Sequence, residues 1–103
     1  MTNPMRFSEI KAKGLARCLA APGLPDKLRI HITELEPDNR PHAAHTHDGV
    51  ELFYVLEGQA TVRVEEELYP LGKNEAILID ASRPHEIFNN SSARVRYLVI
   101  IAK

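Results

Sequence analysis

Three side chains that commonly bind metal ions lie within seven residues of one another in this sequence. His45 and His47 are separated by one residue, and Glu51 follows four positions later. On an extended strand, residues i and i+2 point to the same face, so the two imidazoles would lie side by side. The intervening pair Asp48-Gly49 predicts a tight turn, because glycine tolerates a positive φ. A hairpin at that turn would place Glu51 beside His47.

These side chains form a donor set that suits a divalent transition metal ion. Glu51 shares a strand face with Phe53 and Val55, which are residue types of a protein interior. Burying a carboxylate and imidazoles without partners is costly, and a bound cation removes most of that cost. Two histidines and one carboxylate also leave positions open on iron for oxygen or substrate. His85 begins another predicted strand, and in a closed barrel it could face the first three donors across the lumen.

The remaining histidines and the cysteine are expected to have structural roles. His31 lies in an alternating segment, where we expect it to face solvent, and His42 is expected in a loop. Cys18 is interpreted as a small core or edge residue. Because it is the only cysteine, an internal disulfide is excluded, which fits a reducing compartment.

Short strands are the elements that must position these residues. Apolar and polar residues alternate with period two, and turn residues interrupt them, which is typical of an all-β protein. The predicted strands are residues 28–33, 50–56, 60–64, 76–79, 85–88 and 94–102. Residues 8–21 fit either a short helix capped by Ser8 or two edge strands, 7–10 and 16–21. We favour the strands, because Gly14 would weaken the middle of a helix. The pattern leaves a sandwich and a small barrel open.

Two motifs resemble those of the cupin superfamily. The first is His45-x-His47-x3-Glu51-x6-Gly58, in a family whose histidines and glutamate hold a metal. Asn39 stands where that motif normally begins with glycine, and it too accepts a positive φ. The second motif is similar to residues 74–89, with Pro84, His85 and Asn89 in the expected order. Asn74, Asp80 and Ser82 replace its usual glycine, proline and glycine at turn positions.

The resemblance implies a fold, a ligand set and a cofactor. The fold is a double-stranded β-helix, a jelly-roll barrel of two facing antiparallel sheets. The implied ligands are His45, His47, Glu51 and His85, with one or two coordination positions left for water or substrate. The ion would be Fe, Mn, Ni, Co or Zn, because imidazole and carboxylate do not discriminate among these metals. Asn89 is expected to form a strand-end hydrogen bond.

Two functions follow as hypotheses. The first is a metal-dependent dioxygenase, isomerase or lyase that acts on a small polar molecule, anionic or sugar-like, with Glu51 as a catalytic base. The alternative is a barrel that binds or senses a small ligand without turnover. A purely structural zinc ion is disfavoured, because such sites are normally closed by four ligands that include cysteine. Substrate would contact residues at the mouth of the barrel, for which the candidates are Tyr54, Arg63, Phe88, Arg96 and Tyr97.

Length and composition set the remaining expectations. The 103 residues amount to one domain, with residues 1–26 as an N-terminal edge segment. The net charge is −1 and the basic residues are dispersed, which argues against a nucleic-acid partner. No apolar run approaches the roughly 20 residues that cross a bilayer. Residues 1–10 contain no signal-peptide core, so we expect a cytoplasmic protein. The strand at 94–102 is apolar on both faces from Leu98 onward, which predicts a homodimer.

Overall fold

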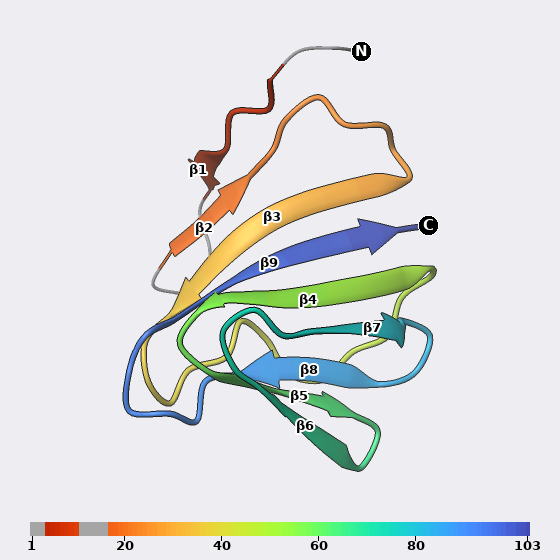
Figure 1. The fold of residues 1–103 in the computed structure, drawn as a ribbon. Coiled ribbons are helices and arrows are strands. Elements are labelled where there is room, and N and C mark those ends of the chain that lie inside the picture. The colour runs from red at the N-terminus through yellow and green to blue at the C-terminus, as the bar shows by residue number, and fades with distance from the viewer. Residues whose placement is uncertain (1–3, 11–16) are drawn as a thin grey trace.

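The computed structural model describes residues 4–10 and 17–103 (Figure 1). Within these residues the chain forms strands and no helix, so the all-β prediction is confirmed. The strands are β1 (Ser8–Ile10), β2 (Arg17–Ala20), β3 (Leu28–Leu35), β4 (Val50–Glu57), β5 (Ala60–Val64), β6 (Glu67–Leu71), β7 (Ala76–Asp80), β8 (His85–Phe88) and β9 (Val95–Ala102). In the described part of the chain, no helix has the length and apolar character needed to cross a membrane.

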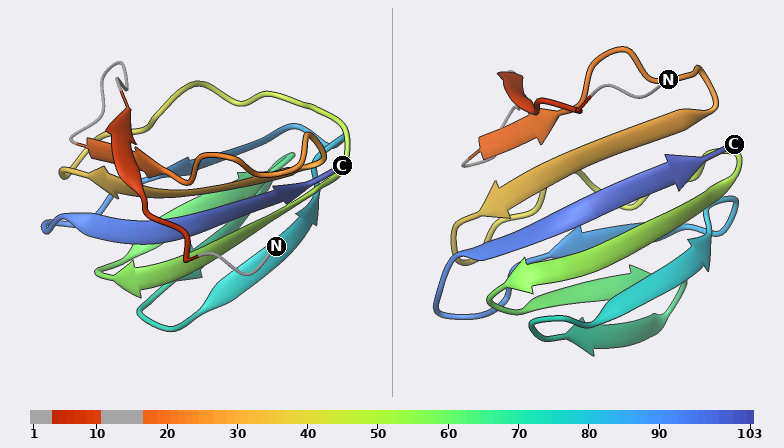
Figure 2. Two further views of the ribbon diagram at one scale, coloured as in Figure 1. Left: turned by 90° about the horizontal axis from the view of Figure 1, so that it is seen from above. Right: turned by 45° about the horizontal axis from the view of Figure 1, so that its top comes forward.

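The strands form two sheets that face each other, as in a jelly roll. The larger sheet has the order β1-β2-β3-β9-β4-β7, and the smaller has the order β6-β5-β8. All the pairs within them are antiparallel. Figure 2 shows β3, β9 and β4 side by side in one layer, with β8 and β5 in the layer behind. The predicted jelly-roll barrel is therefore the observed architecture.

The core fills the space between the sheets with the inward-facing residues of both. Its fully buried members include Val55, Val62, Ile87, Val95 and Val99. Burying each such side chain contributes about 1.5–3 kcal/mol. On β4 the buried positions are 51, 53 and 55, so the alternation that directs Phe53 and Val55 into the core also directs Glu51 inward. Packing of the apolar residues thus fixes the direction of the carboxylate.

The predicted strands match the observed ones closely, with β6 as the exception. This strand was missed because Glu67 and Leu68 follow a charged run and Pro70 interrupts the pattern. Proline lacks an N–H group and is tolerated in strands mainly at a sheet edge. β6 is such an edge, since it pairs with β5 alone in the smaller sheet.

The N-terminal part of the chain extends the larger sheet. β1 is its edge strand and β2 lies between β1 and β3. The strand interpretation of residues 8–21 is therefore confirmed for 8–10 and 17–20, whereas residues 11–16 lie outside the described part. Cys18 of β2 is buried at this edge, with its Sγ atom 3.7 Å from the Thr33 hydroxyl oxygen.

Candidate metal centre

The segment that carries the first two histidines is held by backbone hydrogen bonds from distant residues. The N–H groups of His45 and His85 each donate to the other's carbonyl oxygen, at 3.1 and 3.0 Å. The His47 N–H donates to Ala81 O at 2.9 Å, and the Ala81 N–H donates to Gly49 O at 3.0 Å. The expected hairpin between residues 45–47 and β4 is therefore wrong. Residues 45–49 lie beside 81–85 instead, which still brings His45, His47 and His85 together.

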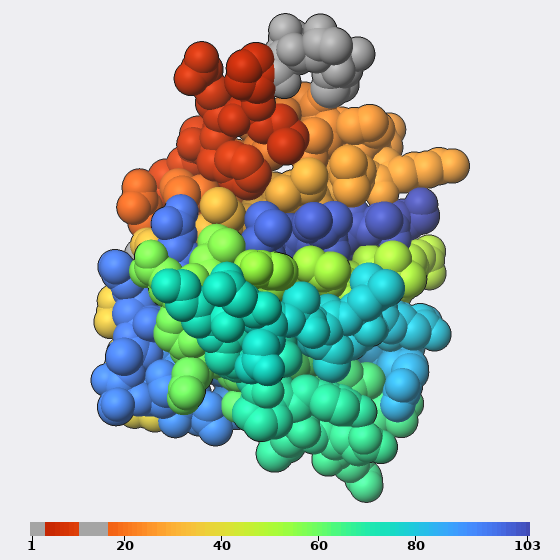
Figure 3. All heavy atoms as spheres, viewed as in Figure 1, coloured from red at the N-terminus to blue at the C-terminus, as the bar shows by residue number. Residues whose placement is uncertain are grey.

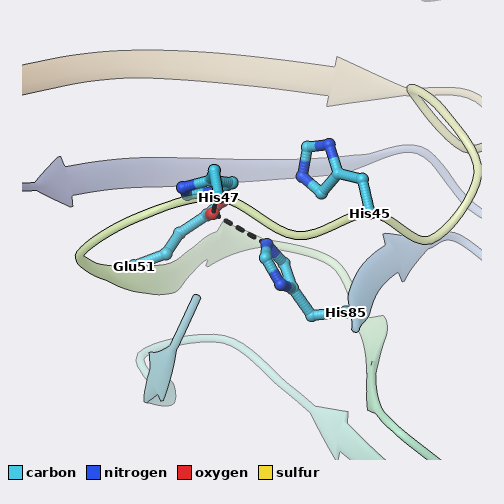
Figure 4. Close-up of side chains that lie close together, drawn as sticks. All are labelled: His45, His47, Glu51 and His85. Atoms are coloured by element: carbon cyan, nitrogen blue, oxygen red, sulfur yellow. Dashed lines mark hydrogen bonds and ion pairs between the residues drawn. The ribbon is translucent and has the colours of Figure 1, made fainter. Parts of the chain in front are cut away.

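Four side chains converge where this segment meets β4 and β8, and we call His45, His47, Glu51 and His85 the four-donor site. One nitrogen or oxygen atom from each lies within 4.8 Å of all the others. Glu51 Oε1 is 2.7 Å from His47 Nε2 and 3.1 Å from His85 Nε2. Figure 4 shows the four side chains pointing toward one another from the loop and the two strands.

The hydrogen bonds on the far side of two rings prepare them to bind an ion. Nδ1 of His47 lies 3.0 Å from Asp48 O, and Nδ1 of His85 lies 2.8 Å from Arg83 O. A neutral imidazole donates through one nitrogen only, so a ring that donates from Nδ1 presents its Nε2 lone pair to Glu51 Oε1. Two such acceptors face each other favourably when a metal ion or a proton lies between them. Carbonyl partners of this kind also orient metal-bound histidines in known sites.

The spacing of the donors fits one transition metal ion. With metal–donor distances of about 2.1 Å, adjacent ligands at a right angle are about 3 Å apart. The observed 2.7 and 3.1 Å contacts agree with that separation. The four-donor site can therefore hold an ion, and three imidazoles with one carboxylate suit several transition metals equally.

Burial divides the four donors into two pairs. His85 and Glu51 are 1% and 5% exposed, whereas His47 is half-buried and His45 is exposed. Despite that exposure, the pKa of His45 lies below its usual value. Desolvation of the ring is the main cause, and the neighbouring His42 and His85 add to it. A lowered pKa keeps the imidazole neutral, which is the form that binds metal.

The site opens into a cavity of about 890 Å³ between the sheets. Phe53, Ile87 and Val99 contribute apolar wall, and Thr33 and Tyr97 contribute hydroxyl groups. Burial raises the pKa of Tyr97 well above its usual value, and the nearby Thr33 hydroxyl acts in the opposite direction. The cavity wall thus combines apolar residues with polar and charged ones that could orient a polar ligand.

One sequence prediction about this wall is wrong. His31 was expected to face solvent, but it is half-buried and lines the cavity. β3 carries its inward row on residues 29, 31, 33 and 35, where Thr33 and Leu35 are buried. The apolar residues Leu28, Ile30 and Ile32 therefore occupy the outer face. Alternation predicts which residues share a face but does not indicate which face is inside.

The register places the five substrate-lining candidates in different surroundings. Among the residues that the structure describes, Tyr97 is the member of this group that lines the cavity. The Tyr54 hydroxyl donates to Asn74 Oδ1 at 3.2 Å, and Arg96 Nε lies 3.7 Å from Glu34. Arg63 and Phe88 belong to β5 and β8 and lie outside the cavity wall.

Two of the wall residues, Arg29 and His31, were not predicted by sequence reasoning. Both residues alternate in sequence with Thr33 and Leu35. Sequence analysis would have found them if residues 29, 31, 33 and 35, rather than 28, 30 and 32, had been assigned to the inner face. Asn89, by contrast, has the expected strand-end role. Its side-chain amide donates to Leu35 O at 3.0 Å and to Ala93 O at 2.8 Å.

Comparisons with known proteins agree with this architecture. The family profile described as Cupin domain matches residues 31–101. No curated protein matches the sequence. Among solved structures, a predicted oxalate decarboxylase from Thermotoga maritima superposes with a TM-score of 0.73, at 20% identity over 95% of this chain and 92% of its own.

Two further structures are similar at the level of the fold. A cupin domain of an XRE family transcriptional regulator from Enterobacter cloacae has a TM-score of 0.70 and 20% identity, and the match covers 84% of this chain and 96% of that one. A sugar phosphate isomerase of the cupin superfamily from Silicibacter pomeroyi has a TM-score of 0.72 and 19% identity, over 89% of this chain and 61% of its own. At these identities, the likeness concerns the fold alone.

Proposed function

The chain belongs to the cupin domain family, and from that premise we propose that it is a metal-dependent enzyme acting on a small polar molecule. The observation that supports this most directly is the convergence of the four-donor site on the cavity. A site built only to stabilise the fold would not need to open onto a space of about 890 Å³. The reaction classes we propose are those of a dioxygenase, an isomerase or a lyase.

Each donor has a task in this proposal. The carbonyl groups of Asp48 and Arg83 hold two imidazoles by Nδ1, so that their Nε2 atoms meet at one point. Glu51 is the carboxylate of the set and is 5% exposed, and we assign to this carboxylate the holding and transfer of a proton. The ion, when bound, supplies Lewis acidity or activates a bound water. Burial of Glu51 and His85 limits their contact with bulk water, which strengthens their electrostatic interactions.

The polar nature of the substrate is also part of the proposal. Two structural neighbours carry names that imply anionic substrates, an oxalate and a sugar phosphate. A molecule of this class has oxygen atoms that can coordinate an ion beside Glu51, and in the cavity it would lie near His31.

A second candidate function is binding or sensing without turnover. The likeness to the cupin domain of a transcriptional regulator favours it, since there the same fold is part of a regulatory protein. The two candidates make different predictions for the purified protein. Retained iron whose absorption spectrum changes on exposure to oxygen supports a dioxygenase. A co-purified small molecule that is bound but never converted supports the sensor.

We also propose a homodimer and a cytoplasmic location. The outer face of the larger sheet carries apolar residues on four strands, β3, β9, β4 and β7, which Figure 3 shows as adjacent bands at the surface. Its members are Leu28, Ile30 and Ile32 of β3, Leu98 and Ile100 of β9, Leu52 of β4 and Leu78 of β7. Leu78 is 64% exposed, and stacking two such faces would cover it. The single free cysteine, Cys18, fits a reducing compartment.

Metal analysis of the protein as purified tests the central proposal. We expect about one transition metal ion per chain in the wild type and at least a ten-fold loss in His47→Ala, which lacks one donor. His42→Ala is the matched control, because His42 is exposed and its ring lies 4.0 Å from that of His45 without belonging to the four-donor site. It should keep the full metal content. Equally little metal in the wild type and in His47→Ala would contradict the proposal.

A further inference from the structure

The inward row of β3 places a positive charge in line with the four-donor site. Strand pairing aligns Arg29 with Ile101 of β9, and Ile101 with Glu51 of β4. Neighbouring strands are about 4.8 Å apart, so the Cα atoms of Arg29 and Glu51 are separated by roughly 10 Å across one row of the sheet. Both residues line the cavity, Glu51 as a buried residue and Arg29 as an exposed one.

Arg29 has no partner for its charge among the residues that the structure describes. No ion pair or side-chain hydrogen bond within that part of the chain involves its guanidinium. Of the acidic residues that share the cavity wall, Glu86 is paired with Arg40 at 3.3 Å and Glu51 belongs to the four-donor site. Asp26 also lines the cavity, but it lies beyond ion-pair distance of Arg29.

His31 lies two residues further along the same row. Its pKa is lowered, chiefly by burial, and the charge of Arg29 contributes to the shift. The Glu51 carboxylate acts in the opposite direction, so His31 is within electrostatic range of both. The described residues give its ring nitrogens no hydrogen-bond partner. A neutral imidazole in this place offers one N–H donor to a ligand.

The charge balance of the cavity follows from these groups. A divalent ion on the four-donor site would carry one net positive charge after Glu51 is counted. Arg29 adds a second positive charge on the other side of the same row. Of the other charged wall residues, Lys103 and Asp26 are opposite in sign, and Glu86 is paired with Arg40. A cavity with two separated positive charges favours a ligand with two separated anionic groups, because each group then meets an opposite charge at short range.

We propose that Arg29, assisted by His31, forms an anion subsite that binds the terminal carboxylate or phosphate of the ligand. The other end of that ligand coordinates the metal ion through its own oxygen atoms. This inference rests on the proposed function, and it narrows the substrate class to small organic dianions such as hydroxy acids that carry a second anionic group. Guanidinium groups bind carboxylate and phosphate alike through paired N–H donors, so the geometry of the subsite accepts either.

Calorimetric titration of the Ni²⁺-loaded protein with three probes tests the subsite. Lactate has the metal-binding hydroxy acid alone, malate adds a carboxylate, and 3-phosphoglycerate adds a phosphate. In the wild type we expect malate or 3-phosphoglycerate to bind at least about ten-fold more tightly than lactate, the effect of one charge-assisted contact. The probe with the larger gain identifies which anion the subsite prefers.

The variant Arg29→Gln should lose this gain while binding Ni²⁺ and lactate as the wild type does. The matched control is Arg63→Gln, because Arg63 is an exposed strand arginine outside the cavity, and it should keep the wild-type preference. A wild type that binds all three probes equally would overturn the subsite, as would an Arg29→Gln protein that still prefers the dianions. A wild type that does not bind Ni²⁺ would instead overturn the proposed function, and the subsite with it.

Discussion

Gly49 lies between two ligands of the four-donor site, at a position where the backbone leaves no room for a side chain. Its φ is 90°, in the left-handed region that favours glycine. A Cβ atom there would overlap the carbonyl oxygen of Ala102 and lie 2.9 Å from Cα of Lys103. Both neighbours are backbone atoms, so they cannot rotate away. Gly49→Ala must therefore shift either the turn that links His47 to Glu51 or the end of β9.

Gly23 is a control in which the backbone conformation is similar and the steric overlap is absent. Its φ is 73°, and nothing lies within 4 Å of the position of a Cβ atom. The left-handed conformation costs a non-glycine residue about 1–2 kcal/mol, which both alanine variants incur. Overlap with fixed atoms costs typically about 1–3 kcal/mol more, which Gly49→Ala alone incurs. We therefore expect the free energy of unfolding to be about 2 kcal/mol lower in Gly49→Ala than in Gly23→Ala.

Urea unfolding of the two variants, in the presence of a chelator, measures this difference without a contribution from bound metal. In thermal unfolding, the same difference corresponds to a gap of roughly 10 °C for a domain of this size. A Ni²⁺ titration should also show weaker binding in Gly49→Ala and unchanged binding in Gly23→Ala. Equal losses of stability in the two variants, within about 0.5 kcal/mol, would show that the end of β9 moves freely and would refute the reasoning.

Two further predictions concern the core and the outer face. Burial raises the pKa of Tyr97, so the folded chain holds this proton more tightly than the unfolded chain does, and the resulting stability is lost as the pH rises above about 10. Between pH 9 and pH 11.5, the urea concentration at the unfolding midpoint should therefore fall less in Tyr97→Phe than in the wild type. An equal fall in both proteins would contradict this. Light scattering should give about twice the 11.6 kDa chain mass for the wild type and for the control Leu68→Lys, and the single-chain mass for Leu78→Lys. A monomeric wild type would exclude the dimer.

Apart from β6, the strands could be predicted from the sequence, but the inner face of β3 could not. Residues 28–33 alternate clearly, and the apolar half of that pattern suggested an inward face made of leucine and isoleucine. In the structure, His31 and Thr33 lie on the row of the buried Val99 and Tyr97 and face inward, so Ile30 and Ile32 face out. Both faces of this strand are partly buried or apolar, so hydrophobicity alone does not determine its orientation. The core residues opposite, Val99 and Tyr97, determine it through strand pairing.

The identity of the four donors could be predicted from the sequence, whereas the backbone geometry around them could not. Residue types and spacing pointed to His45, His47 and Glu51, and the resemblance to the cupin motifs implied His85 as the fourth donor; the structure brings all four together. The backbone around them was predicted incorrectly, because a local turn at Asp48-Gly49 suggested a local hairpin. The actual partners, Ala81 and His85, are more than thirty residues away in sequence. Pairing over that separation leaves no signature in the short segment that it holds.

The fold fixes the two pairs of donors to different degrees, and this difference determines which part of the site a bound ion would stabilise. Glu51 and His85 lie on strands and are almost fully buried, so core packing sets their positions before any ion binds. His45 and His47 lie on a segment that a few backbone hydrogen bonds attach to residues 81–85. An ion bound by all four donors would link that segment to β4 and β8. Because this segment forms part of the cavity wall, the same ion that coordinates a ligand would also fix the shape of the space that receives it.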